Sequence, residues 1–151
     1  MTNNTAVQIA PLSNADYEAW LSLWKSYLTF YETSLPPSTT EKTWRNLLDS
    51  SVPIYGFGAW KDDTLVGITH VMLHPNTWNF TECCYLEDLY VNECVRGQGI
   101  GRTLIEHVYD FATKKGCNRV YWTTQESNAP ARILYDTLAT KTDMVQYRKN
   151  L

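Results

Sequence analysis

The chain has 151 residues, of which 44% are hydrophobic and 19% are charged, and its formal net charge is −3. This length fits a single domain over residues 1–151, since a domain usually takes about 100–200 residues, and the apolar content excludes a disordered chain. The slight negative charge and the lack of a basic stripe argue against a nucleic-acid partner.

The cysteines, the first residues and the lengths of the apolar runs indicate the cellular compartment in which the protein works. Cys83, Cys84, Cys94 and Cys117 form no Cys-x-x-Cys pair, and the three histidines are scattered. We therefore expect no metal and free thiols in a reducing compartment. The first residues resemble no signal peptide, and no apolar run is long enough for a bilayer span. A cytoplasmic protein without a membrane partner is the expectation.

The N-terminal part predicts an edge strand followed by an amphipathic helix. Residues Ala6 to Ala10 alternate modestly, and Pro11 ends the strand. Asn14 or Asp16 can cap the helix. Its apolar stripe follows i, i+3, i+4, i+7 spacing and consists of Tyr17, Trp20, Leu21, Trp24, Tyr27, Leu28 and Tyr31.

The end of this helix is a candidate substrate-binding region. Tyr27, Tyr31 and Glu32 lie there, and their polar tips could face a ligand. Leu35-Pro36-Pro37 then breaks the chain. Thr39 or Thr40 is expected to open a second, short helix.

The middle and the C-terminal part predict further strands and helices in the order typical of a mixed sheet. Strands are expected at Ile54–Trp60, Thr64–Leu73, Tyr85–Val91, Arg119–Thr124 and Met144–Tyr147, with a hairpin turn at Lys61-Asp62-Asp63. Asn128-Ala129-Pro130 should start a last helix, with Asn128 as its cap. Consecutive strands followed by alternating helices and strands predict an α+β fold, a mixed sheet with helices on its faces.

The most informative stretch is strand, glycine-rich turn and helix. The run Tyr85–Val91 carries two carboxylates, Glu87 and Asp88, and leads into Arg96-Gly97-Gln98-Gly99-Ile100-Gly101. Apolar residues then recur at helical spacing up to Lys114-Lys115-Gly116, where cations and a glycine close the helix. The free N–H groups and the dipole at the start of such a helix form an anion site.

The glycine turn matches one of three phosphate-binding signatures. A P-loop needs a Gly-Lys pair, which the sequence lacks, and the dinucleotide pattern G-x-G-x-x-G fails at its third glycine. Arg/Gln-x-x-Gly-x-Gly is satisfied by Arg96, Gly99 and Gly101. The turn therefore predicts a pyrophosphate site to which Arg96 or Arg102 adds charge, although the short pattern alone equally fits an ordinary glycine-rich turn.

The stretch from Tyr85 to Tyr135 resembles the GNAT superfamily of N-acetyltransferases. Tyr85–Val91 with the glycine turn is similar to the spermidine/spermine and thialysine acetyltransferases. Trp122–Asn128 and Tyr147-Arg148-Lys149 resemble the small histone, polyamine and D-amino-acid acetyltransferases. The resemblance implies a GNAT-like acyl-CoA N-acyltransferase fold, acetyl-CoA as donor, a primary amine as acceptor, direct transfer, and a homo-oligomer, either dimer or tetramer.

The resemblance also implies which residues bind the donor. The pyrophosphate would be held by Arg96, Gly97, Gln98, Gly99, Ile100, Gly101 and Arg102. The backbone of Leu89 and Val91, with Tyr90 between them, would pair with the pantetheine as another strand does. Asn128 would touch the pantetheine arm.

Two residues would act on protons. By the same resemblance, Tyr135 would protonate the departing thiolate, and Glu87 would take a proton from the acceptor ammonium, directly or through water. Asp88, Glu87 and Glu32 could hold a second ammonium of the substrate. Cys84 and Cys94 have no activating neighbour in the sequence, so we expect no thiol nucleophile.

Three functions remain open at this point. The leading one is acetylation of a small cationic amine such as a polyamine, thialysine or an amino-acid-like molecule. A protein or histone lysine acetyltransferase is the alternative within enzymes, and it requires an open groove. A non-catalytic acyl-CoA-binding sensor is the alternative of another class, against which Glu87 and Tyr135 together argue.

Overall fold

The predicted strands of the middle of the chain form the centre of a mixed sheet in the computed structural model, which describes residues 6–151. Within these residues the strands are β1 (Gln8–Pro11), β2 (Ile54–Lys61), β3 (Thr64–His74), β4 (Cys83–Val91) and β5 (Arg119–Tyr121). They lie in the order β1-β2-β3-β4-β5. The first four are antiparallel, and β5 runs parallel to β4. The expected α+β fold with a mixed sheet is confirmed.

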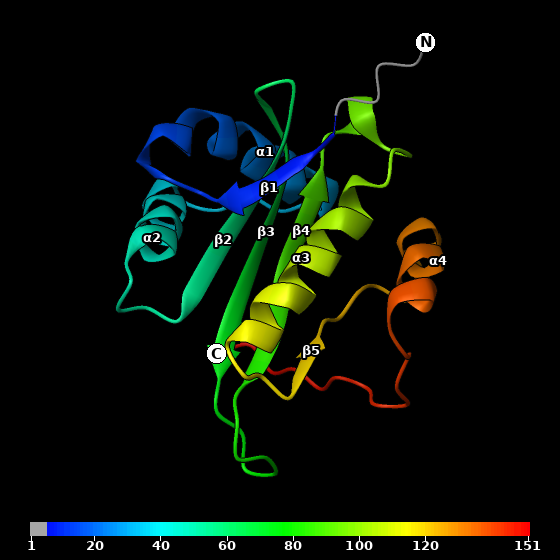
Figure 1. The fold of residues 1–151 in the computed structure, drawn as a ribbon. Helices are drawn as coiled ribbons and strands as arrows, with labels where there is room; N and C mark the ends of the chain where they lie inside the picture. Colours follow the sequence, from blue (N-terminus) through cyan, green and yellow to red (C-terminus); the bar gives the residue numbers. More distant parts are fainter. Residues whose placement is uncertain (1–5) are drawn as a thin grey trace.

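Helices cover both faces of this sheet (Figure 1). They are α1 (Tyr17–Phe30), α2 (Pro37–Leu48), α3 (Ile100–Lys114) and α4 (Ala129–Leu138). The first two lie on one face and α3 lies on the other, while α4 stands beside α3, beyond the end of β5 (Figure 1). No helix within residues 6–151 has both the length and the apolar character needed to cross a bilayer.

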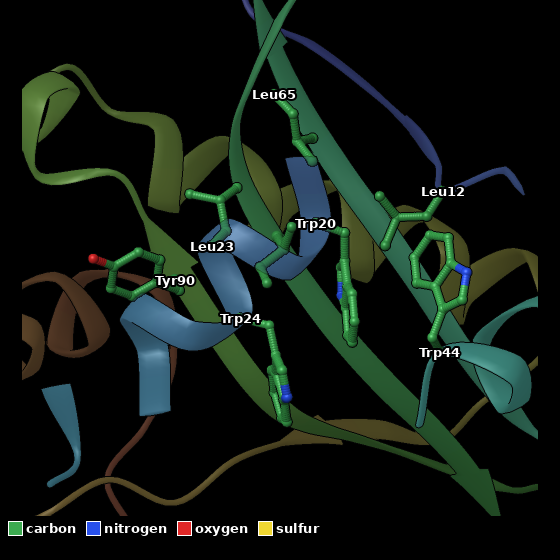
Figure 2. Close-up of a cluster of buried hydrophobic side chains, with 8 residues drawn as sticks. Leu12, Trp20, Leu23, Trp24, Trp44, Leu65 and Tyr90 are labelled. Atoms are coloured by element: carbon green, nitrogen blue, oxygen red, sulfur yellow. The ribbon is translucent and has the colours of Figure 1, made fainter. Parts of the chain in front are cut away.

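Aromatic side chains fill the layer between α1 and the sheet. Trp20, Trp24 and Trp44 pack against one another there, with Trp20 fully buried and its ring centroid 4.8 Å from that of Trp44. Tyr90 comes from β4, and its hydroxyl points away from the tryptophans (Figure 2). Burial of each such side chain contributes roughly 1.5–3 kcal/mol, so this cluster fixes α1 on the sheet.

A β-bulge divides β4 into two segments. His70 of β3 is paired with Asp88, but the next residue, Val71, is paired with Leu86, so Glu87 is the extra residue. Below the bulge, Leu86 packs with the α3 side of the core. Above it, Asp88 instead contacts a side chain of α1. Residues two apart share a face in a regular strand, so the bulge has reversed the alternation.

The lower segment (Cys83–Leu86) and the upper segment (Asp88–Val91) also differ in their neighbours. β5 pairs with β4 only at Cys83, Cys84 and Tyr85. Beyond Tyr85 the two parallel strands separate, and α4 follows β5 on that side (Figure 1). Among the strands of residues 6–151, the upper segment therefore pairs with β3 alone and has an open edge.

Several expected boundaries need correction. The second helix begins at Pro37 rather than at Thr39 or Thr40, because proline fits the first helical position. Neither Asn14 nor Asp16 caps α1 through its side chain; the Asp16 carboxylate accepts from the Ser13 N–H instead. The strand expected over Arg119–Thr124 ends at Tyr121, where it leaves β4.

The final strand expected at Met144–Tyr147 is wrong. Residues 139–151 form neither helix nor strand, and Met144, Val145 and Tyr147 are 81%, 76% and 93% exposed. Alternating apolar residues predict a strand only where a neighbouring strand supplies hydrogen bonds, and none within residues 6–151 pairs with this segment.

Candidate functional site

The glycine turn before α3 has the open backbone that an anion site requires. Gly97 and Gly99 have φ values of +80° and +79°, a region that side chains other than glycine rarely adopt. No atom lies within 4 Å of the position of a Cβ at either residue. The first turn of α3 contains no acidic residue of its own that could interact with the free N–H groups at the start of the helix.

Two arginines flank this turn at different places. Arg96 donates through Nε to the Val91 carbonyl at 3.2 Å, and its guanidinium lies over the Tyr90 ring at 5.4 Å. Arg102 donates to the Thr137 hydroxyl of α4 at 2.6 Å. Arg96 is therefore held at the open edge of β4, and Arg102 is held between α3 and α4. The remaining turn residues expected in the site also lie here: Gln98, which accepts from Lys61, and Ile100 and Gly101, which begin α3.

The backbone of the upper segment faces two ways. The Asn92 N–H donates to Val66 of β3, and Tyr90, two residues earlier, pairs with Ile68 of the same strand. Neighbouring residues in a strand direct their N–H and C=O groups to opposite sides. The groups of Leu89 and Val91 therefore point away from β3, toward the open edge.

The bulge brings both candidate carboxylates to the α1 side. Asp88 accepts from the Tyr27 hydroxyl at 2.6 Å and lies 2.9 Å from His70 Nδ1. Glu87 is exposed. Partial loss of hydration, followed by the charge of Asp88, raises the pKa of Glu87, and positive charge on His70 would oppose this rise. The site therefore holds one fixed carboxylate beside one of increased basicity.

Two tyrosines at the end of α1 lie beside these carboxylates, and a third tyrosine stands on α4. The rings of Tyr27 and Tyr31 meet edge to face at 5.0 Å. Burial and the neighbouring Asp88 raise the pKa of Tyr27 far above its usual value, so this phenol always donates to the carboxylate. Burial, with a contribution from Tyr31, raises the pKa of Tyr135 on α4 to about 12. Tyr27 and Tyr31 are thus brought together with Asp88, whereas Tyr135 packs on the α3 side of the core beside Trp122.

Two predicted site residues stand apart from this group. Glu32 is exposed and adopts a φ of +53°. Its backbone N–H donates to the Thr29 carbonyl at 2.9 Å, and its side chain makes no hydrogen bond or ion pair within residues 6–151. Asn128 occupies the cap position of α4, but its side chain donates to the Thr124 hydroxyl at 3.2 Å instead of capping the helix. Burial raises the pKa of the Cys84 thiol to about 12, so this group stays protonated and does not act as a nucleophile.

Sequence reasoning missed the buried partners of Asp88. His70 is 2% exposed, and its Nε2 accepts a hydrogen bond of 3.0 Å from the Trp20 indole. Thr69 donates to the Asp88 carbonyl. A histidine inside the apolar strand run around residue 70 was the available signal, but only the register of β3 against β4 reveals its partner.

The chain matches the model of the acetyltransferase (GNAT) family over residues 17–139. It is 38% identical over 149 residues to the D-amino-acid N-acetyltransferase HPA3 of Saccharomyces cerevisiae, covering 97% of this chain and 92% of the relative. It is 30% identical over 101 residues to a thialysine N-epsilon-acetyltransferase of Caenorhabditis elegans, covering 67% of this chain and 61% of that one.

Solved structures share the fold. An aminoglycoside N-acetyltransferase, AAC(6')-Iy, in complex with CoA superimposes with a TM-score of 0.82 at 19% identity, covering 100% of this chain and 99% of that one. At this identity the likeness is one of fold. The family model and the relative that spans nearly the whole chain decide the family: the chain belongs to the GNAT family of acetyltransferases.

Proposed function

We propose that the protein transfers the acetyl group of acetyl-CoA to a primary amine of a small cationic acceptor, such as a polyamine, thialysine or an amino-acid-like molecule. The observation that carries this proposal is the combination, on one strand, of an open backbone edge and two carboxylates at a bulge. The names of the D-amino-acid and thialysine relatives support acceptors of this size.

The donor site fits the shape and charge of CoA. A diphosphate needs converging N–H groups and nearby cations, and the first turn of α3 lies beside Arg96 and Arg102. Gly97 and Gly99 leave the space in front of the turn clear. A pantetheine arm carries amide groups that can bond to the open edge at Leu89 and Val91, and Asn128 lies at the start of α4, beyond β5.

Glu87 is proposed as the base. An alkyl ammonium has a pKa of about 10 and must lose a proton before its nitrogen can attack a thioester. The raised pKa of Glu87 makes its carboxylate a better proton acceptor. The proton passes directly or through one water, and Asp88 and the rim tyrosines Tyr27 and Tyr31 hold the ammonium end of the acceptor.

Tyr135 is proposed as the acid for the departing sulfur. Its pKa of about 12 keeps the phenol protonated throughout the neutral range. Since an ordinary thiol titrates near 8.5, complete transfer to a hydrated thiolate would cost about 5 kcal/mol. The loss of hydration that raises the pKa of the phenol also raises the pKa of a thiol in the same site. The difference between the pKa of the phenol and the pKa of the thiol is therefore smaller than these values suggest.

Two glycines at opposite ends of α3 test donor binding. Gly99 and Gly116 have nearly equal φ values, +79° and +76°, and no atom lies within 4 Å of a Cβ at either. At each position an alanine held in this left-handed conformation costs roughly 1–2 kcal/mol of stability. We expect only Gly99→Ala to weaken acetyl-CoA binding in calorimetry. Equal binding by the two variants would contradict the diphosphate site.

Acceptor choice is tested by CoA release across polyamines, thialysine, D- and L-amino acids and a basic peptide. We expect turnover with at least one small amine. Turnover with the peptide alone would support the alternative, a protein lysine acetyltransferase. Absence of turnover with preserved acetyl-CoA binding would support a sensor.

Assembly into a homo-oligomer is also proposed. Met144, Val145, Tyr147 and Leu151 are all more than three-quarters exposed, in a segment without regular structure. Apolar side chains gathered on one segment favour contact with another chain. Light scattering of the full chain should give a dimer or tetramer, and a monomer at micromolar concentration would contradict this proposal.

A further inference from the structure

A buried line of hydrogen bonds connects the core to the candidate acceptor site. The Trp20 Nε1–H group donates to His70 Nε2 at 3.0 Å, and His70 Nδ1 lies 2.9 Å from one oxygen of Asp88. The other oxygen of Asp88 accepts from Tyr27. Trp20 and His70 are 0% and 2% exposed, and the Asp88 side chain is 13% exposed. Only the carboxylate end of this line reaches the surface.

The hydrogen bonds determine the form of the imidazole. An indole N–H group only donates, so His70 Nε2 must accept and cannot carry a proton. Nδ1 therefore carries the hydrogen and donates it to Asp88. The imidazole is neutral in this arrangement, and the negative charge of Asp88 is not cancelled from the core side.

Among residues 6–151, no lysine or arginine forms an ion pair with Asp88. The imidazole packs against the rings of Trp20 and Trp24, with centroids at 6.0 and 5.4 Å. Trp24 donates to Thr40 of α2 instead of to the histidine. The titratable groups that face His70 and Asp88 come from β4, from α1 and from the residue after α1: Glu87, Tyr27 and Tyr31.

We propose that Trp20 and His70 are positioning residues for the amine acceptor: the indole N–H keeps the imidazole neutral, and the imidazole fixes Asp88 as an uncancelled anion that binds the acceptor ammonium. The proposal rests on the acetyltransferase function proposed above. A buried histidine with only a structural role would form hydrogen bonds to other buried groups. His70 instead donates to the carboxylate of Asp88, which lies beside the proposed base Glu87.

Charge on His70 would weaken the site in two ways. An imidazolium would pair with Asp88 and compete with the substrate ammonium. It would also lower the basicity of Glu87, since positive charge at His70 opposes the raised pKa of that carboxyl group. The single indole N–H thus protects both carboxylates from being neutralised on acidification.

Two tryptophans provide a matched test. Trp20→Phe removes the hydrogen bond to His70 and frees Nε2 for a proton, whereas Trp24→Phe removes the bond to Thr40 from the same cluster. We expect Trp20→Phe to raise the KM of the amine about tenfold at about pH 6 and little at about pH 8.5, because an opposite charge this close shifts ionic equilibria by roughly 1–3 pKa units. Its KM for acetyl-CoA should stay unchanged, and Trp24→Phe should show no such pH dependence.

Nitrogen-15 NMR of the imidazole gives a readout independent of turnover. In the wild-type protein Nε2 should remain unprotonated from about pH 8.5 to about pH 6, and in Trp20→Phe it should gain a proton over that range. If the wild-type protein acetylates no small amine but His70 is found neutral with Nε2 unprotonated, the proposed function is wrong. The inference about the neutral imidazole would then still hold. A protonated Nε2 in the wild type, or equal KM for wild type and Trp20→Phe at pH 6, would overturn the inference.

A second pair of variants covers the case in which Trp20→Phe does not fold. The amide of His70→Asn can donate to Asp88 in place of Nδ1–H and cannot become charged, whereas His70→Leu donates nothing. We expect the asparagine variant to have a KM for the amine that is within a few-fold of wild type and does not depend on pH. The leucine variant should have a much higher KM for the amine. Equal KM values for the two would contradict the positioning role.

Discussion

Below its bulge, β4 pairs with strands on both sides at Cys83, Cys84 and Tyr85, whereas above the bulge it pairs only with β3. The lower segment buries small and apolar side chains, including Leu86 at 4% exposure. The upper segment directs backbone groups to an open edge and places Asp88 in a polar network. One strand therefore serves as core at one end and as site at the other.

The difference shows how a stable sheet accommodates polar chemistry. A single extra residue, Glu87, changes which side chains face α1, and a short β5 leaves the edge free. If the comparison is right, substitutions above the bulge should affect rate and binding, and substitutions below it should affect stability.

The largest expected effect comes from the proposed acid, Tyr135 of α4. Tyr135→Phe should lower kcat about a hundredfold to ten-thousandfold while acetyl-CoA affinity is kept, since general acid catalysis contributes in this range. Tyr121→Phe is the matched control, because this tyrosine ends β5 beside the lower segment and bonds to His74. Steady-state kinetics and calorimetry measure both, and equal losses of kcat would remove the distinction between the segments.

Below the bulge, Leu86→Ala should lower the free energy of unfolding by roughly 2–5 kcal/mol, the usual cost of a cavity in a packed core. Leu86 packs with Val71, Ile105 and Val108 on the α3 side. Below the melting temperature, kcat should remain within a few-fold of wild type. Denaturant titration measures the first effect, and a large loss of kcat in the folded variant would show that the lower segment also shapes the site.

The raised pKa of Glu87 should appear in the pH profile. A base acts only when ionised, so kcat/KM of the wild type should fall on acidification through a pKa above the ordinary value for glutamate. Glu87→Gln should lower kcat/KM and remove this acid limb. An unchanged limb in the variant would assign the proton transfer to another group or to water alone.

The smallest expected effect is on stability. A carboxyl group whose pKa is raised on folding binds its proton more tightly in the folded state, so its contribution to stability falls as pH rises above about 4.3. Glu87→Gln should therefore be slightly more stable than wild type at pH 7, by at most about 0.5 kcal/mol as for other surface substitutions. In thermal melts below about pH 4, the variant and the wild type should be equally stable. A wild type that is more stable than Glu87→Gln at pH 7 would contradict the expected direction of the effect.

The periodicity of apolar residues in the sequence predicts much of the fold, but the sequence predicts the candidate site only in part. The Asp62–Asp63 turn, the apolar face of α3 and the glycine turn are local patterns, and the structure contains them as expected. The bulge at Glu87 and the contact of His70 with Asp88 depend on strand register, which local sequence does not encode. The Met144–Tyr147 error has the same origin, because alternation does not identify a partner strand.

The most direct test of the central claim is residue-resolved amide exchange along β4, with and without CoA. The Leu89 and Val91 amides should exchange quickly in the free protein and slow markedly with CoA, because they point to the open edge, while Tyr90, bonded to β3, should be slow in both states. If CoA binds and leaves the exchange of Leu89 and Val91 unchanged, the upper segment is not the donor edge and the account is wrong.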